Sequence, residues 1–229
     1  KDCGLDISKL QDTHRRLVKK FSISQSHATA DLSAASDSIK SDLLNRILPR
    51  KCYNAVKQAT THSIDIDGVR NHTESVLPMG NGFTFPLETL IFYTIIKAIG
   101  TLSGIDGIFS VYGDDLIYPS KLHKYVVAVF PQFHFVLNVD KTYVDFPFRE
   151  SCGEDFYRGV PVRPFMLQGD SQNLRSRPYQ SYLYKTLNGL LRRWSEHEIP
   201  KTVYYILSLL SVTATEVYRV PPSYPDTAG

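Results

Sequence analysis

Two tight-turn signals, each set between runs of β-forming residues, constrain the fold of this chain more than any other feature. In "SIDIDGVRN", apolar and polar residues alternate up to an Asp-Gly dipeptide, which is typical of a two-residue hairpin turn. In "VYGDDLIYP", residues 111–119, β-formers flank Gly113, Asp114 and Asp115. Hairpins join antiparallel strands, whereas parallel strands need long crossovers. We therefore predict an α+β fold in which helices pack on a largely antiparallel sheet.

Hydrophobic periodicity predicts the elements around these turns. In the expected strands, apolar residues alternate with polar ones. In the expected helices, apolar residues recur at helical spacing, and proline or glycine stands near the helix ends. We expect strands over 27–33, 107–112, 116–118 and 133–139, helices over 33–49, 51–60, 86–100 and 120–131, hairpins over 62–76 and 146–165, and mainly helix over 171–212.

Composition is that of an ordinary globular protein, with 42% hydrophobic and 21% charged residues, so the chain can bury a core. A net charge of +3 is too small to indicate a nucleic-acid partner by itself. Cys3, Cys52 and Cys152 are far apart and odd in number, which indicates free thiols in a reducing compartment. The apolar runs are too short to span a bilayer, and no signal peptide is visible, so we expect no membrane association. Because the chain begins at Lys1 without an obvious cap, we expect a fragment of a longer polypeptide.

Four aspartates stand at predicted element ends. Asp31 closes a predicted strand, Asp37 lies near a helix start, and Asp114 and Asp115 occupy the second turn. Each signal alone has an ordinary explanation, since most Gly-Asp-Asp sequences are turns and an aspartate before a helix is usually a cap. Carboxylates converging from neighbouring strands would repel each other, and a pair of Mg²⁺ ions would remove that penalty. Two such ions about 3.5–4 Å apart assist phosphoryl displacement, as in polymerases.

Five blocks occur in a fixed order along about residues 23–166: "ATADLSAASDSI", "MGNGFTFPLETLIF", "VYGDDLI", "FVLNVDKTY" and "FPFRESCGEDFYRGVPVRPF". Through these blocks the chain resembles the RNA-directed RNA polymerases (replicase beta subunits) of levivirus-type positive-strand RNA bacteriophages, the Qβ-like group. The long strings are far more specific than Gly-Asp-Asp alone. The blocks match polymerase motifs A to E in that order.

The resemblance implies a domain organisation. It places a polymerase palm with motifs A–E at 27–166, with the catalytic region at about 17–147. Residues 1–26 would be an N-terminal remnant of the fingers/palm junction, 167–219 a C-terminal helical thumb-like region, and 220–229 a disordered tail.

The resemblance also implies a reaction and its partners. The chain would transfer nucleotides from rNTPs onto an RNA 3′-hydroxyl under the direction of an RNA template, and so replicate a viral genome. Two Mg²⁺ ions would serve as cofactors, with Mn²⁺ as a substitute. Template and nascent RNA would be partners, host translation factors EF-Tu and EF-Ts would join by family resemblance, and the location would be the cytoplasm of the infected bacterial host.

Individual roles follow from matching the motifs to positions in this chain. Polar side chains near the nucleotide suit recognition of the ribose 2′-hydroxyl, which donates and accepts, and glycines let backbone approach closely. The expected metal ligands are Asp31, the carbonyl of Leu32, Asp114 and Asp115; the nucleotide and ribose contacts are Ser36, Asp37, Gly80 and Asn81; the RNA contacts are Gly82, Gly113 and Arg149; and Lys141 is the general acid, catalytic together with the three aspartates.

Several of these roles have structural alternatives. Asn81 could simply be a left-handed loop residue between two glycines, and Lys141 a solvated lysine after a strand. Arg149 could form an ion pair with Glu150 or Glu154 rather than contact the primer.

Departures from the family pattern keep a second function open. Pro78 stands where the phage block usually has serine, and Pro86 where it has glutamate. Only 30 residues precede Asp31, too few for the fingers of the family. The alternative is therefore a catalytically inactive RNA-binding or structural palm fragment. A reverse transcriptase is a third possibility, disfavoured because Asp37 is polar where those enzymes usually carry a bulky aromatic residue.

Overall fold

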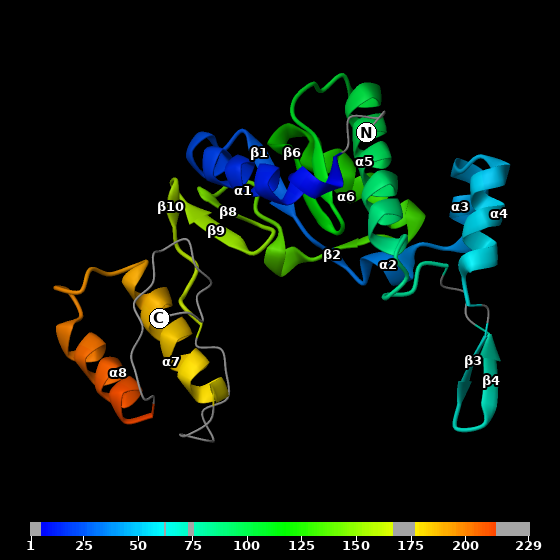
Figure 1. Ribbon diagram of the computed structural model, residues 1–229. Coiled ribbons are helices and arrows are strands. Elements are labelled where there is room, and N and C mark those ends of the chain that lie inside the picture. Colours follow the sequence, from blue (N-terminus) through cyan, green and yellow to red (C-terminus); the bar gives the residue numbers. More distant parts are fainter. Residues whose placement is uncertain (1–5, 62, 73–75, 167–176, 214–229) are drawn as a thin grey trace. The chain divides into compact units, whose positions relative to one another are not determined.

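The computed structural model describes residues 6–61, 63–72, 76–166 and 177–213. The chain divides into two compact units, Lys1–Arg163 and Pro164–Gly229 (Figure 1). The predicted tail 220–229 lies outside the described residues, as do 167–176 of the predicted thumb-like region. The helices of the first unit are α1 (Ile7–Ser24), α2 (Ala35–Ser38), α3 (Ser41–Ile47), α4 (Arg50–Ala59), α5 (Thr84–Ser103) and α6 (His123–Val129), with 3₁₀ turns at Ser120–Leu122, Phe130–Phe133 and Val139–Lys141.

The described strands pair only in antiparallel fashion, which confirms the predicted α+β class. A central sheet has the order β1-β6-β5, a second has the order β10-β9-β8, and two-stranded pairs join β2 with β7 and β3 with β4. Both predicted hairpins are present. The strands are β1 (His27–Ala30), β2 (Leu32–Ser33), β3 (Ser63–Ile66), β4 (Val69–His72), β5 (Ser110–Tyr112), β6 (Asp115–Pro119), β7 (Val136–Leu137), β8 (Phe148–Ser151), β9 (Glu154–Tyr157) and β10 (Val160–Pro161).

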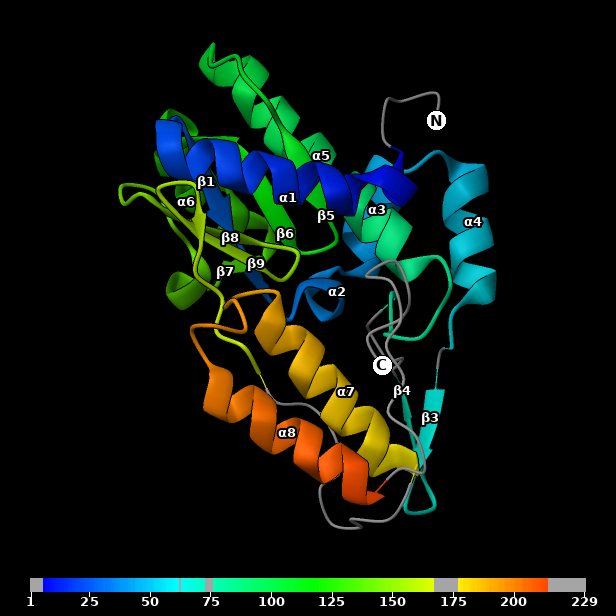
Figure 2. The same ribbon diagram turned by 60° about the vertical axis from the view of Figure 1, so that its left-hand side comes forward.

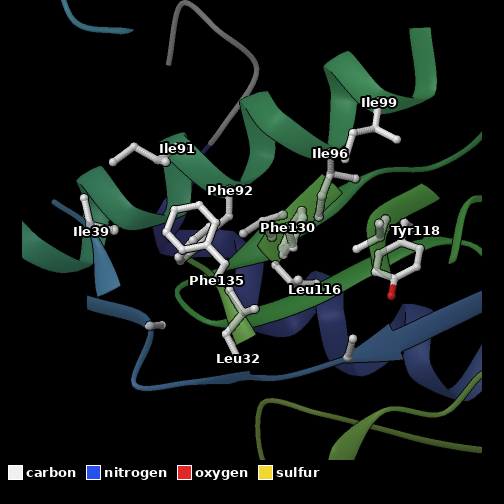
Figure 3. Packing of buried hydrophobic residues seen from close by; sticks show 14 of the residues in the cluster. Leu32, Ile39, Ile91, Phe92, Ile96, Ile99, Leu116, Tyr118, Phe130 and Phe135 are labelled. Atoms are coloured by element: carbon white, nitrogen blue, oxygen red, sulfur yellow. The ribbon is translucent and has the colours of Figure 1, made fainter. Parts of the chain in front are cut away.

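The central sheet is covered on both faces. Successive residues of a strand point to opposite faces, and β6 shows this with fully buried Leu116, Ile117 and Tyr118. Ile117 packs with Val18 and Phe21 of α1. Leu116 and Tyr118 belong to the main core, where the apolar side of α5 points toward them and toward the aromatic residues after α6 (Figure 3). The sheet is thus held between α1 and α5.

Helix α1 was not among the predicted elements, because residues 1–26 are dominated by charged and polar side chains. Its buried residues nevertheless recur at helical spacing, at Leu10, His14, Val18 and Phe21. That narrow stripe is sufficient to hold α1 in place, because α1 packs on the outside of the sheet with one face only. It contacts β1, β5, β8 and β9 (Figure 2). A four-residue stripe was therefore the signal that could have revealed it.

Other boundaries differ from the predictions for local reasons. Helix α5 runs past Gly100 and ends at Ser103, followed by Gly104 in the left-handed region at φ +65°. Gly100 is instead a packing position, since a Cβ there would lie 2.5 Å from the ring of Phe109. The helix predicted over 33–49 is split into α2 and α3, and the strand predicted over 133–139 is reduced to β7.

Helix α5 is long and apolar enough to cross a membrane, but the core helices of other proteins meet the same criteria of length and composition. Of its most apolar window, 39% is buried inside the protein. It is the one described helix that meets this test, and a single such helix is weak support for a membrane span.

The second unit is a pair of helices, α7 (Arg177–Leu191) and α8 (Pro200–Thr213), which lie side by side (Figures 1 and 2). Pro178 and Pro200, expected as helix breaks, stand in the first turns of α7 and α8, where proline is tolerated. Their shared core is made of Tyr179, Leu183, Tyr184, Leu187, Val203, Ile206 and Leu210.

Candidate active site

The Gly-Asp-Asp sequence forms the tip of the β5–β6 hairpin. Tyr112 pairs with Asp115, so Gly113 and Asp114 are the two turn residues. On the other side of β6, strand β1 pairs Ala30 with Leu116, which brings Asp31, the next residue, to the same end of the sheet. The register of three strands therefore gathers the aspartates that the sequence placed far apart.

Asp114 lies in the field of Asp31. Partial burial and the charge of Asp31 raise the pKa of Asp114. The Asp114 carboxyl therefore gives up its proton less readily than an isolated aspartate does.

Asp115 is anchored from the second sheet. Its Oδ2 accepts a hydrogen bond of 2.9 Å from the backbone N–H of Cys152, in the β8–β9 turn. Burial and the charge of Asp114 raise the pKa of Asp115, although this hydrogen bond acts in the opposite direction. Burial and the charge of Asp115 raise the pKa of the Cys152 thiol to about 12, so that thiol stays protonated.

The hairpin tip is docked on the first turns of α5. Gly113 has φ +61°, and a Cβ there would lie 2.4 Å from the ring of Phe85 and 3.2 Å from the Glu88 carboxyl. Its backbone N–H donates to the hydroxyl of Thr89, a fully buried residue, over 2.8 Å. This corrects the expectation that Gly113 leaves room for RNA: the space beside its Cα is filled by α5, and the glycine is needed for docking.

Glu88 is a site residue that the sequence analysis missed. It is only 7% exposed, and burial together with the charge of Asp114 raises its pKa to about 7. An acidic residue in the first turns of a helix is ordinarily explained as a complement to the helix dipole, which gives no indication of a contact with the hairpin. An acidic residue on an otherwise apolar helix face was the available signal.

Lys141 lies in the same cluster. Its Nζ forms a 3.2 Å ion pair with Asp31 Oδ2, and Asn138 Nδ2 donates to that oxygen over 3.4 Å. The side-chain hydrogen bond and the charge of Asp31 raise the pKa of Lys141, so the ammonium form is favoured. The Lys141 side chain is also 53% exposed, so it is a solvated lysine, as the alternative stated, and it is paired with Asp31. Its role as general acid stays a prediction.

The expected nucleotide contacts lie on α2, which contacts α5, and on the loop before α5. Asp37 is exposed and Ser36 half-buried in α2. In the loop, Gly80 has φ +100°, and Gly82 has open space at its Cβ position. The Asn81 side-chain nitrogen is buried and has no hydrogen-bond partner among the described residues. The predicted ribose role of these residues stays a prediction.

Arg149 is the clearest correction. The side chain was expected near the primer strand, but it is 0% exposed. Its donors all reach backbone carbonyls: Nε to His27 (2.6 Å), Nη1 to Phe146 and to Phe148 (2.6 Å), and Nη2 to Val144 (2.7 Å). Neither RNA contact nor the alternative ion pair describes this residue, which ties β8 to β1 and to the segment before β8.

Within the described part of the chain, no group of three or more His, Cys, Asp or Glu side chains has the arrangement of a metal site as it stands. Lys141 pairs with Asp31, and Cys152 with Asp115. The donor set nevertheless fits Mg²⁺, because it consists of hard carboxylate oxygens, two of them on groups whose pKa is raised by burial and neighbouring charge. The magnesium prediction stays a prediction.

Comparison with known proteins decides the family. Residues 1–225 match the family model described as RNA replicase, beta-chain. The chain belongs to the RNA replicase beta-chain family. Among curated relatives, the RNA-directed RNA polymerase beta chain of Escherichia phage MS2 is 41% identical over 174 residues, which are 76% of this chain and 32% of that protein. The RNA-directed RNA polymerase subunit beta of Enterobacteria phage SP is 35% identical over 223 residues, 95% of this chain and 38% of that protein.

These replicase relatives are much longer than the chain, which spans about a third of their length. Among solved structures, a foamy viral protease-reverse transcriptase in complex with RNA/DNA hybrid aligns with a TM-score of 0.47 and 14% identity, over 82% of this chain and 27% of that one. A likeness of that size does not establish a shared fold. The replicase assignment therefore depends on sequence.

Proposed function

We propose that this chain is the palm-containing catalytic core of an RNA-directed RNA polymerase. It would join rNTPs to an RNA 3′-hydroxyl as directed by an RNA template, in the replication of a phage genome. The observation that carries the proposal is the convergence of Asp31, Asp114 and Asp115 at one sheet end, where burial and neighbouring charge raise the pKa of two of them. A cluster that costs stability in this way is typical of a functional site.

The donor set defines what the site could hold. Asp31, Asp114, Asp115 and the carbonyl of Leu32 would bind two Mg²⁺ ions, or Mn²⁺ in their place. Such ions supply the positive charge that activates a 3′-hydroxyl and stabilises a pyrophosphate leaving group.

The remaining residues would act on the nucleotide directly. Lys141 carries a proton close to Asp31 and would donate it to the departing pyrophosphate. Asp37, Ser36 and the unpartnered amide of Asn81 would bond the ribose hydroxyls, and so reject deoxynucleotides. Glu88 and Thr89 touch no substrate in this scheme, and they position the hairpin.

The decisive experiment separates metal binding from synthesis. Mn²⁺ binding to the purified 229-residue chain is measured by electron paramagnetic resonance, and RNA-templated incorporation of labelled rNTPs is measured in parallel. Asp114→Asn is expected to weaken Mn²⁺ binding and to abolish incorporation. Asp42→Asn is the matched control, because Asp42 is exposed and pairs with Arg46 on α3.

The outcomes distinguish the two functions that the sequence left open. Equal Mn²⁺ binding by Asp114→Asn and the unchanged chain would overturn the metal site. Mn²⁺ binding that depends on Asp114, without incorporation by a chain that still binds RNA, would favour the catalytically inactive RNA-binding fragment. EF-Tu, EF-Ts and the bacterial cytoplasm remain proposals from the family resemblance, testable by co-purification from an infected host.

A further inference from the structure

We propose that the second unit carries its own binding site for single-stranded RNA, in a basic cavity beside α7. The cavity has a volume of about 420 Å³, large enough for one nucleotide. It is lined by Phe165, Met166, Lys185, Thr186, Gly189, Arg192 and Arg193. No carboxylate is among its lining residues. The proposal rests on the proposed function only in naming RNA as the ligand.

The basic residues of the cavity share one side of α7. Lys185, Gly189 and Arg192 follow each other at spacings of four and three residues, which places them on one helix face. The opposite face, with Leu183 and Leu187, packs in the core shared with α8. A rise of about 1.5 Å per residue separates Lys185 and Arg192 by about 10 Å along the axis. The cations thus form a stripe able to follow a nucleic-acid backbone.

The segment around this stripe contains no acidic residue. From residue 177 to 195 the sequence has four basic residues and no acidic one. Lys185 and Arg193 are exposed and form no ion pair with any residue in the described ranges. Glu198, one of the acidic residues that follow, accepts hydrogen bonds from the backbone N–H and the hydroxyl of Ser195.

A purely structural explanation accounts for only part of the pattern. Arg192 and Arg193 stand at the C-terminal end of α7, where cations offset the helix dipole. Lys185 lies about two turns earlier, and the dipole effect is confined to the last turn. Its place beside the same cavity therefore needs another reason, and a polyanion supplies one.

An aromatic ring gives the cavity its second feature. Phe165 lies against α7 at Gly189, where a Cβ would be 2.1 Å from the ring. Glycine is thus required for the ring to reach the helix surface at this point. A half-buried phenylalanine beside cations is the combination by which proteins hold single-stranded nucleic acid, with a base stacked on the ring and phosphates on Lys and Arg. This pairing favours RNA over an acidic protein segment.

The test measures RNA affinity by fluorescence anisotropy of a labelled oligoribonucleotide, with EDTA present and without rNTPs. Lys185→Ala and Arg193→Ala are each expected to lower the slope of log affinity against log salt by about 0.7, the value for one lost phosphate contact. Lys201→Ala is the matched control, since Lys201 is an exposed lysine of the same unit on α8 and does not line the cavity. For Lys201→Ala, the slope of log affinity against log salt is expected to equal that of the unchanged chain.

A second probe isolates the stacking contact. Phe165→Leu is expected to weaken binding of intact RNA about tenfold and to have no effect on an oligonucleotide with abasic residues. Gly189→Ala is the second variant for the case in which Phe165→Leu unfolds the unit. It retains every charge but displaces the Phe165 ring, so it should weaken binding of intact RNA and leave binding of abasic RNA unchanged. Circular dichroism verifies folding of each variant.

Three results would overturn the proposal: unchanged slopes for Lys185→Ala and Arg193→Ala, an equal loss for Lys201→Ala, or an equal loss of intact and abasic RNA for Phe165→Leu. Binding is measured without metal or rNTPs, so the assay does not depend on the candidate metal site. A negative result in this binding assay therefore does not contradict the polymerase proposal. A failure of RNA synthesis, in turn, does not contradict the proposed RNA-binding cavity.

Discussion

Arg149 and the aspartates at the β5–β6 hairpin are two places where the first unit holds charge among packed residues, and they differ in how that charge is compensated. Arg149 is fully buried, and its guanidinium donates to four backbone carbonyls. Asp31 and Asp114 lie at the same end of the central sheet instead, and burial and the charge of Asp31 raise the pKa of Asp114.

The difference is the one expected between a structural charge and the charges of the proposed active site. A buried charge with most of its donors bonded to backbone organises the chain around it, as four of the five Arg149 N–H groups do here. In the aspartate cluster, the Lys141 ammonium on Asp31 and the Cys152 N–H on Asp115 offset only part of the repulsion. The remaining repulsion costs stability, and a cation would relieve it. Both regions carry residues of the family's motifs, so membership of a motif does not by itself distinguish the two roles.

The largest expected effect tests the structural side of the comparison. Arg149→Met keeps the apolar stem and leaves four buried carbonyls without donors, so the free energy of unfolding of the first unit should fall by about 4 kcal/mol. Urea unfolding followed by far-ultraviolet circular dichroism measures the change. Fluorescence of Trp194, the only tryptophan, reports the second unit and should not shift.

Arg46→Ala is the matched control for Arg149. Arg46 forms an exposed ion pair with Asp42 four residues earlier, at 3.0 Å. Its loss should cost less than about 0.5 kcal/mol. A similar cost for both arginines would mean that the carbonyl cage adds no stability.

The next effect concerns a buried group that stays neutral. His14 is 0% exposed, its Nδ1 lies 2.8 Å from the hydroxyl of Ser151, and burial lowers its pKa to about 4 from 6.5. Between these values the unfolded chain binds a proton that the folded chain does not. Stability should therefore fall as pH drops from 6.5 to 4, by up to about 3 kcal/mol.

His14→Gln isolates this contribution to the pH dependence. Burial also lowers the pKa of His27 to about 4, so only the difference between the unchanged chain and the variant is informative. That difference in the free energy of unfolding should be largest above pH 6.5 and should shrink on acidification. A difference that does not vary with pH would contradict the assignment.

A smaller effect tests how the candidate site is held. Thr89→Val keeps the shape of the side chain but leaves the Gly113 N–H without its acceptor, at a cost of about 2 kcal/mol. Thr89→Ser keeps the hydroxyl and loses one methyl group, at about 1 kcal/mol. RNA-templated incorporation should fall for valine and persist for serine. Equal incorporation by the two variants would show that this hydrogen bond does not position the hairpin.

The smallest effect has the opposite sign. Asp114→Asn removes one of the repelling charges and should stabilise the first unit by about 0.5–1 kcal/mol, the modest value expected for a partly solvated functional group. The same urea titration measures it beside Arg149→Met. A loss of stability would mean that Asp114 supports the fold, and the contrast between the two regions would disappear.

Local sequence was sufficient for much of the fold. The turn dipeptides predicted the antiparallel hairpins, and the apolar period predicted α5, because these features depend on neighbours a few residues away. Helix α1 escaped prediction because its buried stripe is narrow and its other faces are charged. Helix α5 ends at Ser103 before Gly104, and Gly100 packs against Phe109, a contact that sequence spacing does not reveal.

The sequence by itself determined the order of the motifs, the family and the residues that could carry the chemistry. Only the tertiary structure decided which of them share a site, since Asp31 meets Asn138 across 107 residues of chain and Arg149 meets His27 across 122. It assigned Arg149 to the interior, and it brought Glu88 and Thr89 to the hairpin. The physical reason is that burial and neighbouring charge set the role of an ionisable group, and both arise only when distant segments pack together.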